Sequence, residues 1–158
     1  QSGHNLPDDI LLEREQEYYT AAAESLGSFD TLADVLADLQ GARVPIAVAS
    51  SGGPDRIRFS IEKVGIAHYF DVICSAAEVA AGKPAPDLFL LAAKRLGVKP
   101  ADCLVIEDSV PGIEGAVAAG MRPLGFTSSH AAQVLERAGA ETIFNDYEQL
   151  RQMLRNIL

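Results

Sequence analysis

Residues 103–112 read CLVIEDSVPG. Cys103 to Ile106 form an apolar run as long as a buried strand, and two adjacent carboxylates, Glu107 and Asp108, follow it directly. The apolar pattern resumes at Gly112 with the spacing of a helix. This stretch therefore predicts a buried strand that ends in acidic side chains and leads into a helix.

The same order of strand, turn and helix recurs on both sides of this stretch. Because the strands are apolar on both faces and alternate with helices, they predict an α/β fold with a parallel sheet covered by helices. Ligands of such sheets bind at the carboxyl ends of the strands. The predicted strands are 44–49, 71–75, 103–106, 123–126 and 142–144, and the predicted helices are 8–26, 31–40, 54–64, 86–96, 112–119, 131–138 and 147–158.

Composition excludes several classes of protein. The chain has 158 residues, 48% of them hydrophobic and 22% charged, which is ordinary for one globular domain. A net charge of −9 repels a phosphate backbone, so no nucleic-acid partner is expected. No apolar run approaches the ~20 residues that cross a bilayer, and residues 1–9 do not resemble a signal peptide. Cys74 and Cys103 fit no zinc or disulfide spacing, so we expect two buried free thiols and a cytoplasmic protein.

Two further strand ends carry polar residues. Ser50, Ser51, Gly52 and Gly53 follow the strand 44–49 and precede a helix, a setting in which a hydroxyl and free backbone N–H groups can hold a phosphate. A plain turn of the same composition is the alternative. Residues 82–87 read GKPAPD, and the prolines stiffen the loop, so that Lys83 can neutralise a bound anion. The alternative for Lys83 is an ordinary solvated lysine.

The carboxylates Glu107 and Asp108 have two interpretations. Mg²⁺ prefers one or two carboxylates together with water and substrate oxygens, so the pair could hold this ion. Alternatively, Asp108 or Ser109 could cap the helix that begins near Pro111. The residues alone leave both open.

The order of these motifs resembles the haloacid dehalogenase-like (HAD) superfamily, in particular the subgroup of β-phosphoglucomutase and phosphoglycolate phosphatase. The resemblance rests on residues 49–52, 82–87 and 106–109, with Gly112 and residues 118–121. It implies a three-layer Rossmann-like core over residues 29–158. Residues 1–28 would then be the C-terminal part of a small helical cap.

The resemblance implies a Mg²⁺-dependent phosphatase that works through an aspartyl-phosphate on a small phosphorylated metabolite, such as a sugar phosphate or phosphoglycolate. In that family the equivalents of Ser50, Ser51 and Gly52 bind the phosphoryl group. Lys83 would neutralise the nucleophile and the phosphate. Glu107 and Asp108 would hold Mg²⁺.

One motif of the family is absent from this chain. The nucleophile lies in an Asp-x-Asp motif after an N-terminal strand, and residues 1–43 contain no such strand. We therefore expect this chain alone to be inactive. In the family that strand lies between those equivalent to 44–49 and 103–106, so we expect these two not to pair and an N-terminal segment or a partner strand to fill the space.

Two alternative functions remain. A phosphomutase of the β-phosphoglucomutase type would need extra cations around the turn 50–53, which we call the serine turn. Gly52, Gly53 and Pro54 offer none. A non-catalytic interaction domain would also fit the missing nucleophile. Arg56 begins a helix near this turn, and we expect it to lie on a solvated helix face, with contact to the substrate as the alternative. We expect the scattered His4, His68 and His130 to be surface or loop residues.

Overall fold

The computed structural model describes residues 8–157, with their side chains from Gln16 onward. His4 and the outer ends of the predicted cap and core segments lie outside the described residues. Within residues 8–157, no helix combines the length and the apolar character needed to cross a membrane.

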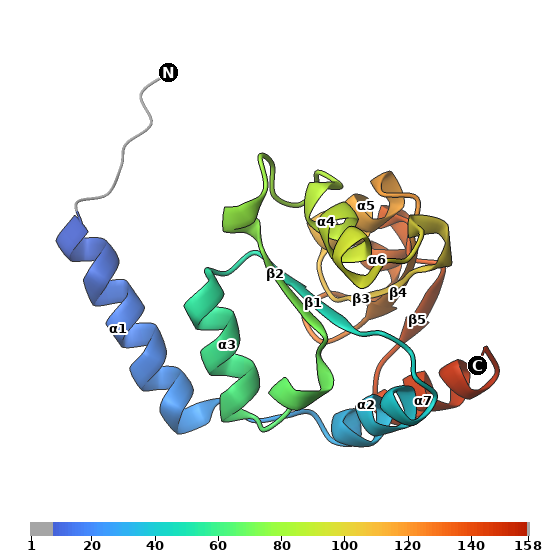
Figure 1. The fold of residues 1–158 in the computed structure, drawn as a ribbon, viewed down its shortest axis with the longest axis horizontal. Helices are drawn as coiled ribbons and strands as arrows, with labels where there is room; N and C mark the ends of the chain where they lie inside the picture. The colour runs from blue at the N-terminus through green and yellow to red at the C-terminus, as the bar shows by residue number, and fades with distance from the viewer. Residues whose placement is uncertain (1–7, 158) are drawn as a thin grey trace.

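The chain alternates strands and helices, as predicted (Figure 1). The strands are β1 (Ala47–Ser50), β2 (Val72–Ser75), β3 (Leu104–Glu107), β4 (Arg122–Phe126) and β5 (Thr142–Phe144). The α-helices are α1 (Asp8–Ser25), α2 (Leu32–Gly41), α3 (Pro54–Lys63), α4 (Asp87–Leu96), α5 (Val110–Ala118), α6 (Ala132–Ala138) and α7 (Tyr147–Arg155). Three short 3-10 helices cover Ala67–Tyr69, Ala76–Glu78 and Pro100–Asp102.

All strand pairs are parallel, which confirms the α/β, Rossmann-like class. β1 pairs with β2, with Ala47 opposite Val72. β4 lies between β3 and β5, with Leu104 opposite Arg122 and Leu124 opposite Thr142. The carboxyl ends of β1 and β3 carry the polar residues singled out from the sequence.

Helices pack on both faces of the strands. On one face α4 covers β1 and β2, where Ala47 and Ala49 contact a cluster around the fully buried Cys74 and Leu88. On the other face, Val48 packs into a cluster formed by α2 and α3. This alternation places β1 between two helical layers, which explains why this strand is apolar on both faces.

Several element bounds differ from the predictions by one to three residues. β1 begins at Ala47 rather than at residue 44, because Pro45 has no N–H and the Ile46 amide donates to the Asp71 side chain (2.9 Å). β3 extends to Glu107, so this glutamate is the last strand residue rather than the first loop residue. Both cysteines are free, but only Cys74 is buried, so the expectation of two buried thiols is wrong for the half-buried Cys103.

Among the described residues, β1 and β3 are not hydrogen-bonded to each other, in agreement with the prediction. The two sheets are separate, and each presents an unpaired edge strand. Ile106 in β3 is 38% exposed, although its neighbour Val105 is buried. An exposed isoleucine in the third residue of a parallel strand indicates that the sheet face around it is not covered.

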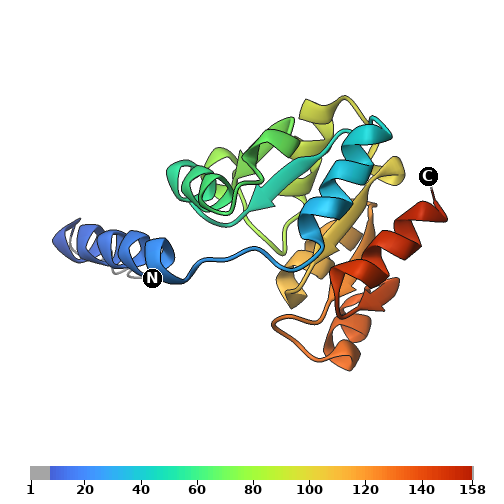
Figure 2. The ribbon, with the colours of Figure 1, turned by 90° about the horizontal axis from the view of Figure 1, so that it is seen from below.

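Helix α1 stands apart from the body of the molecule and is joined to α2 by an extended segment (Figure 2). It lies beside α3, where Tyr19 stacks edge-on against Phe59 at a ring-centroid distance of 5.0 Å. The contact with α3 therefore fixes α1 next to the helix that follows the serine turn.

Candidate functional site

The serine turn is held in place from two sides. Ser50 Oγ accepts a hydrogen bond from the Gly52 amide (3.1 Å). The hydroxyl of the buried Ser75, at the end of β2, donates to the Gly52 carbonyl (2.6 Å). Parallel pairing brings Ser50 and Ser75 side by side, which is why the end of β2 can fix the turn after β1.

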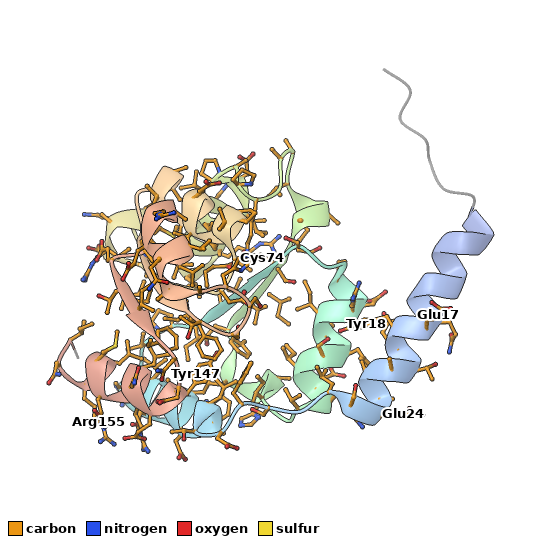
Figure 3. All side chains as sticks on the ribbon, turned by 180° about the vertical axis from the view of Figure 1, so that it is seen from behind. Glu17, Tyr18, Glu24, Cys74, Tyr147 and Arg155 are labelled. Carbon is orange, nitrogen blue, oxygen red and sulfur yellow. The ribbon has the colours of Figure 1, made fainter. Side chains whose placement is uncertain are left out.

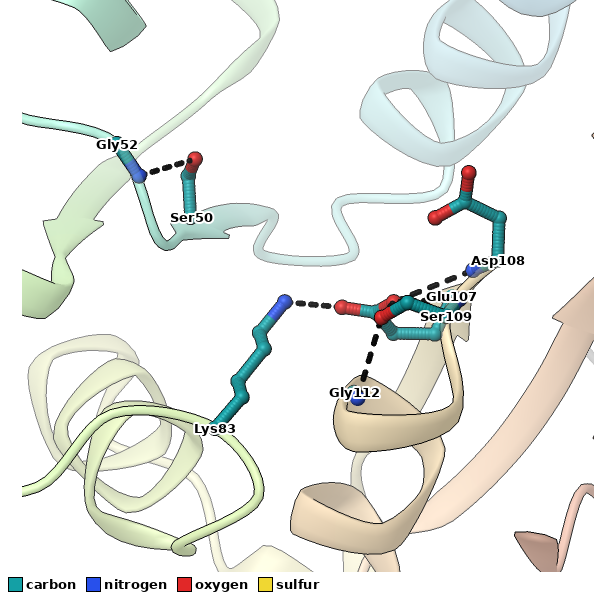
Figure 4. A network of polar contacts seen from close by, with 7 residues as sticks. All are labelled: Ser50, Gly52, Lys83, Glu107, Asp108, Ser109 and Gly112. Atoms are coloured by element: carbon teal, nitrogen blue, oxygen red, sulfur yellow. Dashed lines mark hydrogen bonds and ion pairs between the residues drawn. The ribbon is translucent and has the colours of Figure 1, made fainter. Parts of the chain in front are cut away.

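Lys83 is not a solvated lysine. Its side chain is 12% exposed, its Nζ donates to Glu107 Oε1, and it lies 5.0 Å from the centre of the Phe89 ring. Figure 4 shows the lysine reaching from its loop to the end of β3. The structure therefore overturns the alternative of a solvated lysine and places the ammonium at the carboxyl edge.

Glu107 has hydrogen bonds on both carboxylate oxygens. Oε1 accepts from Lys83, while Oε2 accepts from Ser109 Oγ (2.8 Å) and from the backbone amides of Asp108 and Ser109 (both 3.2 Å). The carboxylate lies over the first turn of α5, where a Cβ on Gly112 would overlap it. Glycine at position 112 is therefore a steric requirement for this placement of Glu107.

The cap of helix α5 is Ser109, not Asp108. Ser109 Oγ accepts from the Gly112 amide (3.2 Å). This settles one of the alternatives that the sequence left open, because the Asp108 carboxylate is not needed for capping.

Asp108 is held instead by the loop that follows β4. Its Oδ2 accepts from Ser129 Oγ (2.5 Å) and Ser128 Oγ (2.9 Å), and its backbone carbonyl lies 2.8 Å from His130 Nδ1. His130 is an exposed loop residue, as expected, and it also contacts Asp108. The run of polar residues 127–130 directly after a strand was the signal that could have revealed these contacts.

These contacts influence titration at the site. Burial raises the pKa of Asp108, but the hydrogen bonds from Ser129 and Ser128, aided by the charge of His130, outweigh it and bring the pKa below its usual value. Burial, with a smaller contribution from the Asp108 charge, raises the pKa of Tyr147. Tyr147, at the start of α7 (Figure 3), thus lies within the electrostatic reach of Asp108.

A pocket of ≈ 510 Å³ adjoins the serine turn. It lies between β1, α3 and α1, and its lining residues are Tyr18, Val48, Ser50, Ser51, Gly52, Arg56, Ile57, Ser60 and Ile61. The Arg56 guanidinium lies 3.4 Å from the centre of the Tyr18 ring. Arg56 is exposed, as expected, but it faces this pocket rather than only bulk solvent.

The candidate metal ligands fit Mg²⁺ in part. Oδ2 of Asp108 is engaged by two hydroxyls, whereas no hydrogen bond to Oδ1 is found among the described side chains. Glu107 is already paired with Lys83. The described residues form no group of three or more His, Cys, Asp or Glu side chains that could enclose a metal ion. Because Mg²⁺ usually keeps waters and takes substrate oxygens, two carboxylates suffice as the share of this chain.

Figure 4 places the sequence-predicted residues at one edge of the two sheets, with Ser50 on β1 and Lys83, Glu107 and Asp108 grouped at β3. The Ser50 hydroxyl faces Gly52, not Lys83. That Ser50 and Lys83 bind one anion therefore stays a prediction.

Comparison with known proteins identifies the class. A family model for haloacid dehalogenase-like hydrolases matches residues 2–120. The chain therefore belongs to the haloacid dehalogenase-like hydrolases, as the motifs suggested.

Individual relatives indicate the subgroup of the family to which the chain is similar. The chain is 43% identical over 90 residues to fructose-1-phosphate phosphatase YqaB of Escherichia coli, covering 57% of this chain and 47% of that protein. It is 34% identical over 120 residues to phosphoglycolate phosphatase of Shigella boydii, covering 75% and 47%. Both relatives are phosphatases, and the chain spans about half of their length.

A solved structure shows the same fold over almost the whole chain. A Thermotoga maritima protein assigned as a beta-phosphoglucomutase superposes with a TM-score of 0.88 at 26% identity, covering 98% of this chain and 72% of that one. Together with the phosphatases, it places the chain in the β-phosphoglucomutase and phosphoglycolate phosphatase-like subgroup.

Proposed function

We propose that the intact protein carrying these residues is a Mg²⁺-dependent phosphatase of a small phosphorylated metabolite, such as a sugar phosphate or phosphoglycolate. The observation that carries the proposal is the placement of Lys83 and Glu107 as a largely buried ion pair beside Asp108, at the carboxyl end of β3. Burying the Lys83 ammonium costs free energy unless a carboxylate neutralises it, and Glu107 does so here. Such a placement keeps a positive charge at the edge where a phosphate would bind.

Each residue of this edge has a role in the proposal. The Ser50 hydroxyl and the Ser51 amide bind the phosphoryl oxygens, next to the first turn of α3. Gly52 keeps the turn open for the phosphate. The Lys83 ammonium offsets the negative charge of the phosphate and of the attacking carboxylate. Glu107 holds Lys83 in place.

Glu107 and Asp108 are the side chains of this chain that would hold Mg²⁺. When bound, Mg²⁺ neutralises charge that develops on the phosphoryl oxygens. Ser128 and Ser129 hold Oδ2 of Asp108, so Oδ1 would be the oxygen available to the metal ion.

The nucleophile belongs to a segment that this chain does not contain. We propose an Asp-x-Asp strand between β1 and β3, whose first Asp forms an aspartyl-phosphate. The unpaired edges of these strands and the exposed Ile106 support a strand at this place. Residues 1–28 would then be the end of a helical cap and 29–158 the catalytic core, and this chain alone would be inactive. We further propose a cytoplasmic location, with no nucleic-acid or membrane partner.

The test is phosphate release by the intact protein from a panel of sugar phosphates and phosphoglycolate, with and without Mg²⁺. Asp108→Asn is expected to abolish Mg²⁺-dependent turnover while the circular dichroism spectrum stays unchanged. Asp102→Asn, which alters a carboxylate in the 3-10 helix before β3, serves as the control and keeps full turnover. Unchanged turnover and Mg²⁺ dependence in Asp108→Asn would contradict the assignment.

A phosphomutase is the second candidate, because the Thermotoga maritima neighbour is assigned as a beta-phosphoglucomutase. The sequence argument against it was the absence of cations around the serine turn, and Arg56 now weakens that argument. Product analysis separates the two, since a mutase returns an isomeric phosphomonoester and a phosphatase returns inorganic phosphate. Intact protein that lacks both activities would favour a non-catalytic interaction domain.

A further inference from the structure

The pocket beside the serine turn has two chemically different ends. Ser50, Ser51 and Gly52 form one end, which the proposed function assigns to the phosphoryl group. Tyr18, Arg56 and Ser60 form the other end, which that function does not use. Between them, Val48, Ile57 and Ile61 provide an apolar wall. A substrate bound by its phosphate at Ser50 could therefore extend its organic part toward Arg56.

The two ends are close to each other. A Cβ built on Gly52 would lie 3.5 Å from Ser50 Oγ and 3.8 Å from Arg56 Cδ. The aliphatic part of the Arg56 side chain thus lies next to the serine turn. A side chain of this length can reach a group only a few bonds away from a phosphate at Ser50.

Hydrogen-bond accounting shows which groups the far end offers. Ser60 Oγ donates its single hydrogen to the Arg56 carbonyl (2.8 Å). The Tyr18 hydroxyl, 2.7 Å from Ser60 Oγ, must then be the donor of that second bond. Both hydroxyl hydrogens are used, so the guanidinium of Arg56 is the remaining charged donor at this end.

The Arg56 guanidinium is held in position, and no described side chain neutralises it. Stacking on the Tyr18 ring orients it, with 3.4 Å from the guanidinium carbon to the ring centre. No carboxylate among the described side chains lies within ion-pair distance of Arg56. An oriented arginine that has no counter-ion among the described side chains, at the wall of a pocket in a chain of net charge −9, is suited to bind an anion.

The charge count favours a carboxylate over a second phosphate. Arg56 is the single lysine or arginine among the residues that line the described pocket. One guanidinium matches the single charge and the planar fork of a carboxylate. A second phosphate would bring up to two charges and would need another cation.

We infer that Arg56, stacked on Tyr18, is a specificity-determining residue that selects phosphomonoesters with a carboxylate near the phosphate. This inference rests on the proposed phosphatase function and names the class of its substrate. Tyr18 positions the guanidinium from α1, so the docking of α1 on α3 completes the pocket.

The test compares 3-phosphoglycerate with glycerol 3-phosphate, which differ in one carboxylate in place of a CH₂OH group. Phosphate release is measured for the intact protein, for Arg56→Gln and for the control Arg58→Gln, which alters an exposed arginine of the same helix outside the pocket. In Arg56→Gln, kcat/KM for 3-phosphoglycerate should fall by at least about 10-fold, mainly through KM, as for a lost charged hydrogen bond. Glycerol 3-phosphate should change by less than about 3-fold, since it makes no such bond.

Equal losses for both substrates, no loss for either, or a wild-type preference for glycerol 3-phosphate would overturn the inference. Preference for a hexose bisphosphate over 3-phosphoglycerate would overturn the carboxylate assignment in favour of a second phosphate.

Two further measurements separate this inference from the proposed function. Release of phosphate from p-nitrophenyl phosphate, which has no carboxylate, tests the phosphatase function alone. Calorimetric binding of 3-phosphoglycerate to the intact protein tests the pocket without turnover, and Arg56→Gln must weaken it. If binding is unaffected by Arg56→Gln, the inference fails even in an active phosphatase.

Discussion

Glu107 links three parts of the site at the level of single residues. It ends β3, pairs with Lys83 and accepts hydrogen bonds from Ser109 at the start of α5. Its carboxylate occupies the space that a side chain at position 112 would need. The position of the lysine therefore depends on a glycine in another element.

We predict that Gly112→Ala displaces the Glu107 carboxylate and separates it from Lys83, because the new methyl group would overlap the carboxylate. In the intact protein, kcat should fall by roughly 10-fold or more, as expected when a charged group loses its position. Gly41→Ala is the matched control, since a Cβ at that helical glycine meets no atom within 4 Å. Equal kcat values in the two variants would contradict this account.

Asp108 yields a prediction about titration. Removing both hydroxyls in Ser128→Ala/Ser129→Ala takes away the hydrogen bonds that lower its pKa, while burial, which raises it, remains. The pKa of Asp108 should therefore rise, and the carboxylate should protonate at a higher pH than in the wild type. Carboxyl-carbon NMR titration of the intact, Mg²⁺-free protein measures this.

Thr127→Val controls for a general effect of changing this loop, because Thr127 Oγ1 donates to the Phe144 carbonyl (3.4 Å) and not to Asp108. The titration of Asp108 should be the same in Thr127→Val and in the wild type. An unshifted titration in the double variant would show that the hydrogen bonds from Ser128 and Ser129 do not lower this pKa.

At the level of secondary-structure elements, an ion pair joins α2 and α7, which are distant in the sequence. Arg151 in α7 donates from Nε to Asp38 Oδ2 (2.7 Å) and from one terminal nitrogen to Oδ1 (3.1 Å) in α2. Arg155 adds a longer contact to Asp38 (3.4 Å). The hydrogen bond from Arg151, with the charges of Arg151 and Arg155, lowers the pKa of Asp38.

We predict that Asp38→Asn lowers the urea midpoint of the intact protein at pH 7. A lowered folded-state pKa means that the pair stabilises the fold at a pH above the unfolded pKa of about 3.9 and that this stabilisation is lost as the pH falls further. The difference between wild type and variant should therefore shrink below about pH 4. Asp30→Asn, at an exposed carboxylate, should leave the midpoint unchanged at both pH values.

Helix α1 is positioned by a few side-chain contacts with α3. Tyr18 (labelled in Figure 3) forms a hydrogen bond with Ser60, and its ring stacks against the Arg56 guanidinium. Tyr19 packs against Phe59. The Ser60 hydrogen bond is the main influence that lowers the pKa of Tyr18. One face of α1 is thus specific for α3, which is why the pocket beside Ser50 includes a residue from so early in the chain.

The two separate sheets are the main feature of the whole molecule. Among the described residues, β1 and β3 each pair with a strand on one side only, so the backbone N–H and C=O groups of the other edge have no partner strand. Each such group costs on the order of 1–3 kcal/mol if it is buried without a partner. We predict that residues 1–158 expressed alone unfold without a cooperative urea transition, whereas the intact protein unfolds cooperatively.

Hydrogen exchange provides the site-specific measurement. Amides of β1 and β3 should exchange quickly in the 158-residue chain and be protected in the intact protein, while β4, paired on both sides, should be protected in both. Equal protection of β1 and β4 in the short chain would contradict a missing strand.

The sequence determined the order of the strands and helices, the parallel class, the strand ends that carry Ser50, Glu107 and Asp108, and the loop that carries Lys83. These features follow from local patterns, because the types of neighbouring residues indicate which strands are buried on both faces and where turns occur. The motifs also sufficed to recognise the family, which the match over residues 2–120 confirmed.

Only the tertiary structure decided how these residues are paired. It joined Lys83 to Glu107, gave the helix cap to Ser109, brought residues 128–130 onto Asp108 and placed Arg56 on Tyr18. Most of these partners are distant in the sequence, and their meeting depends on strand register and helix packing rather than on local spacing. A sequence pattern can place a charged residue at a strand end, but the folded chain alone determines which neighbour satisfies its charge.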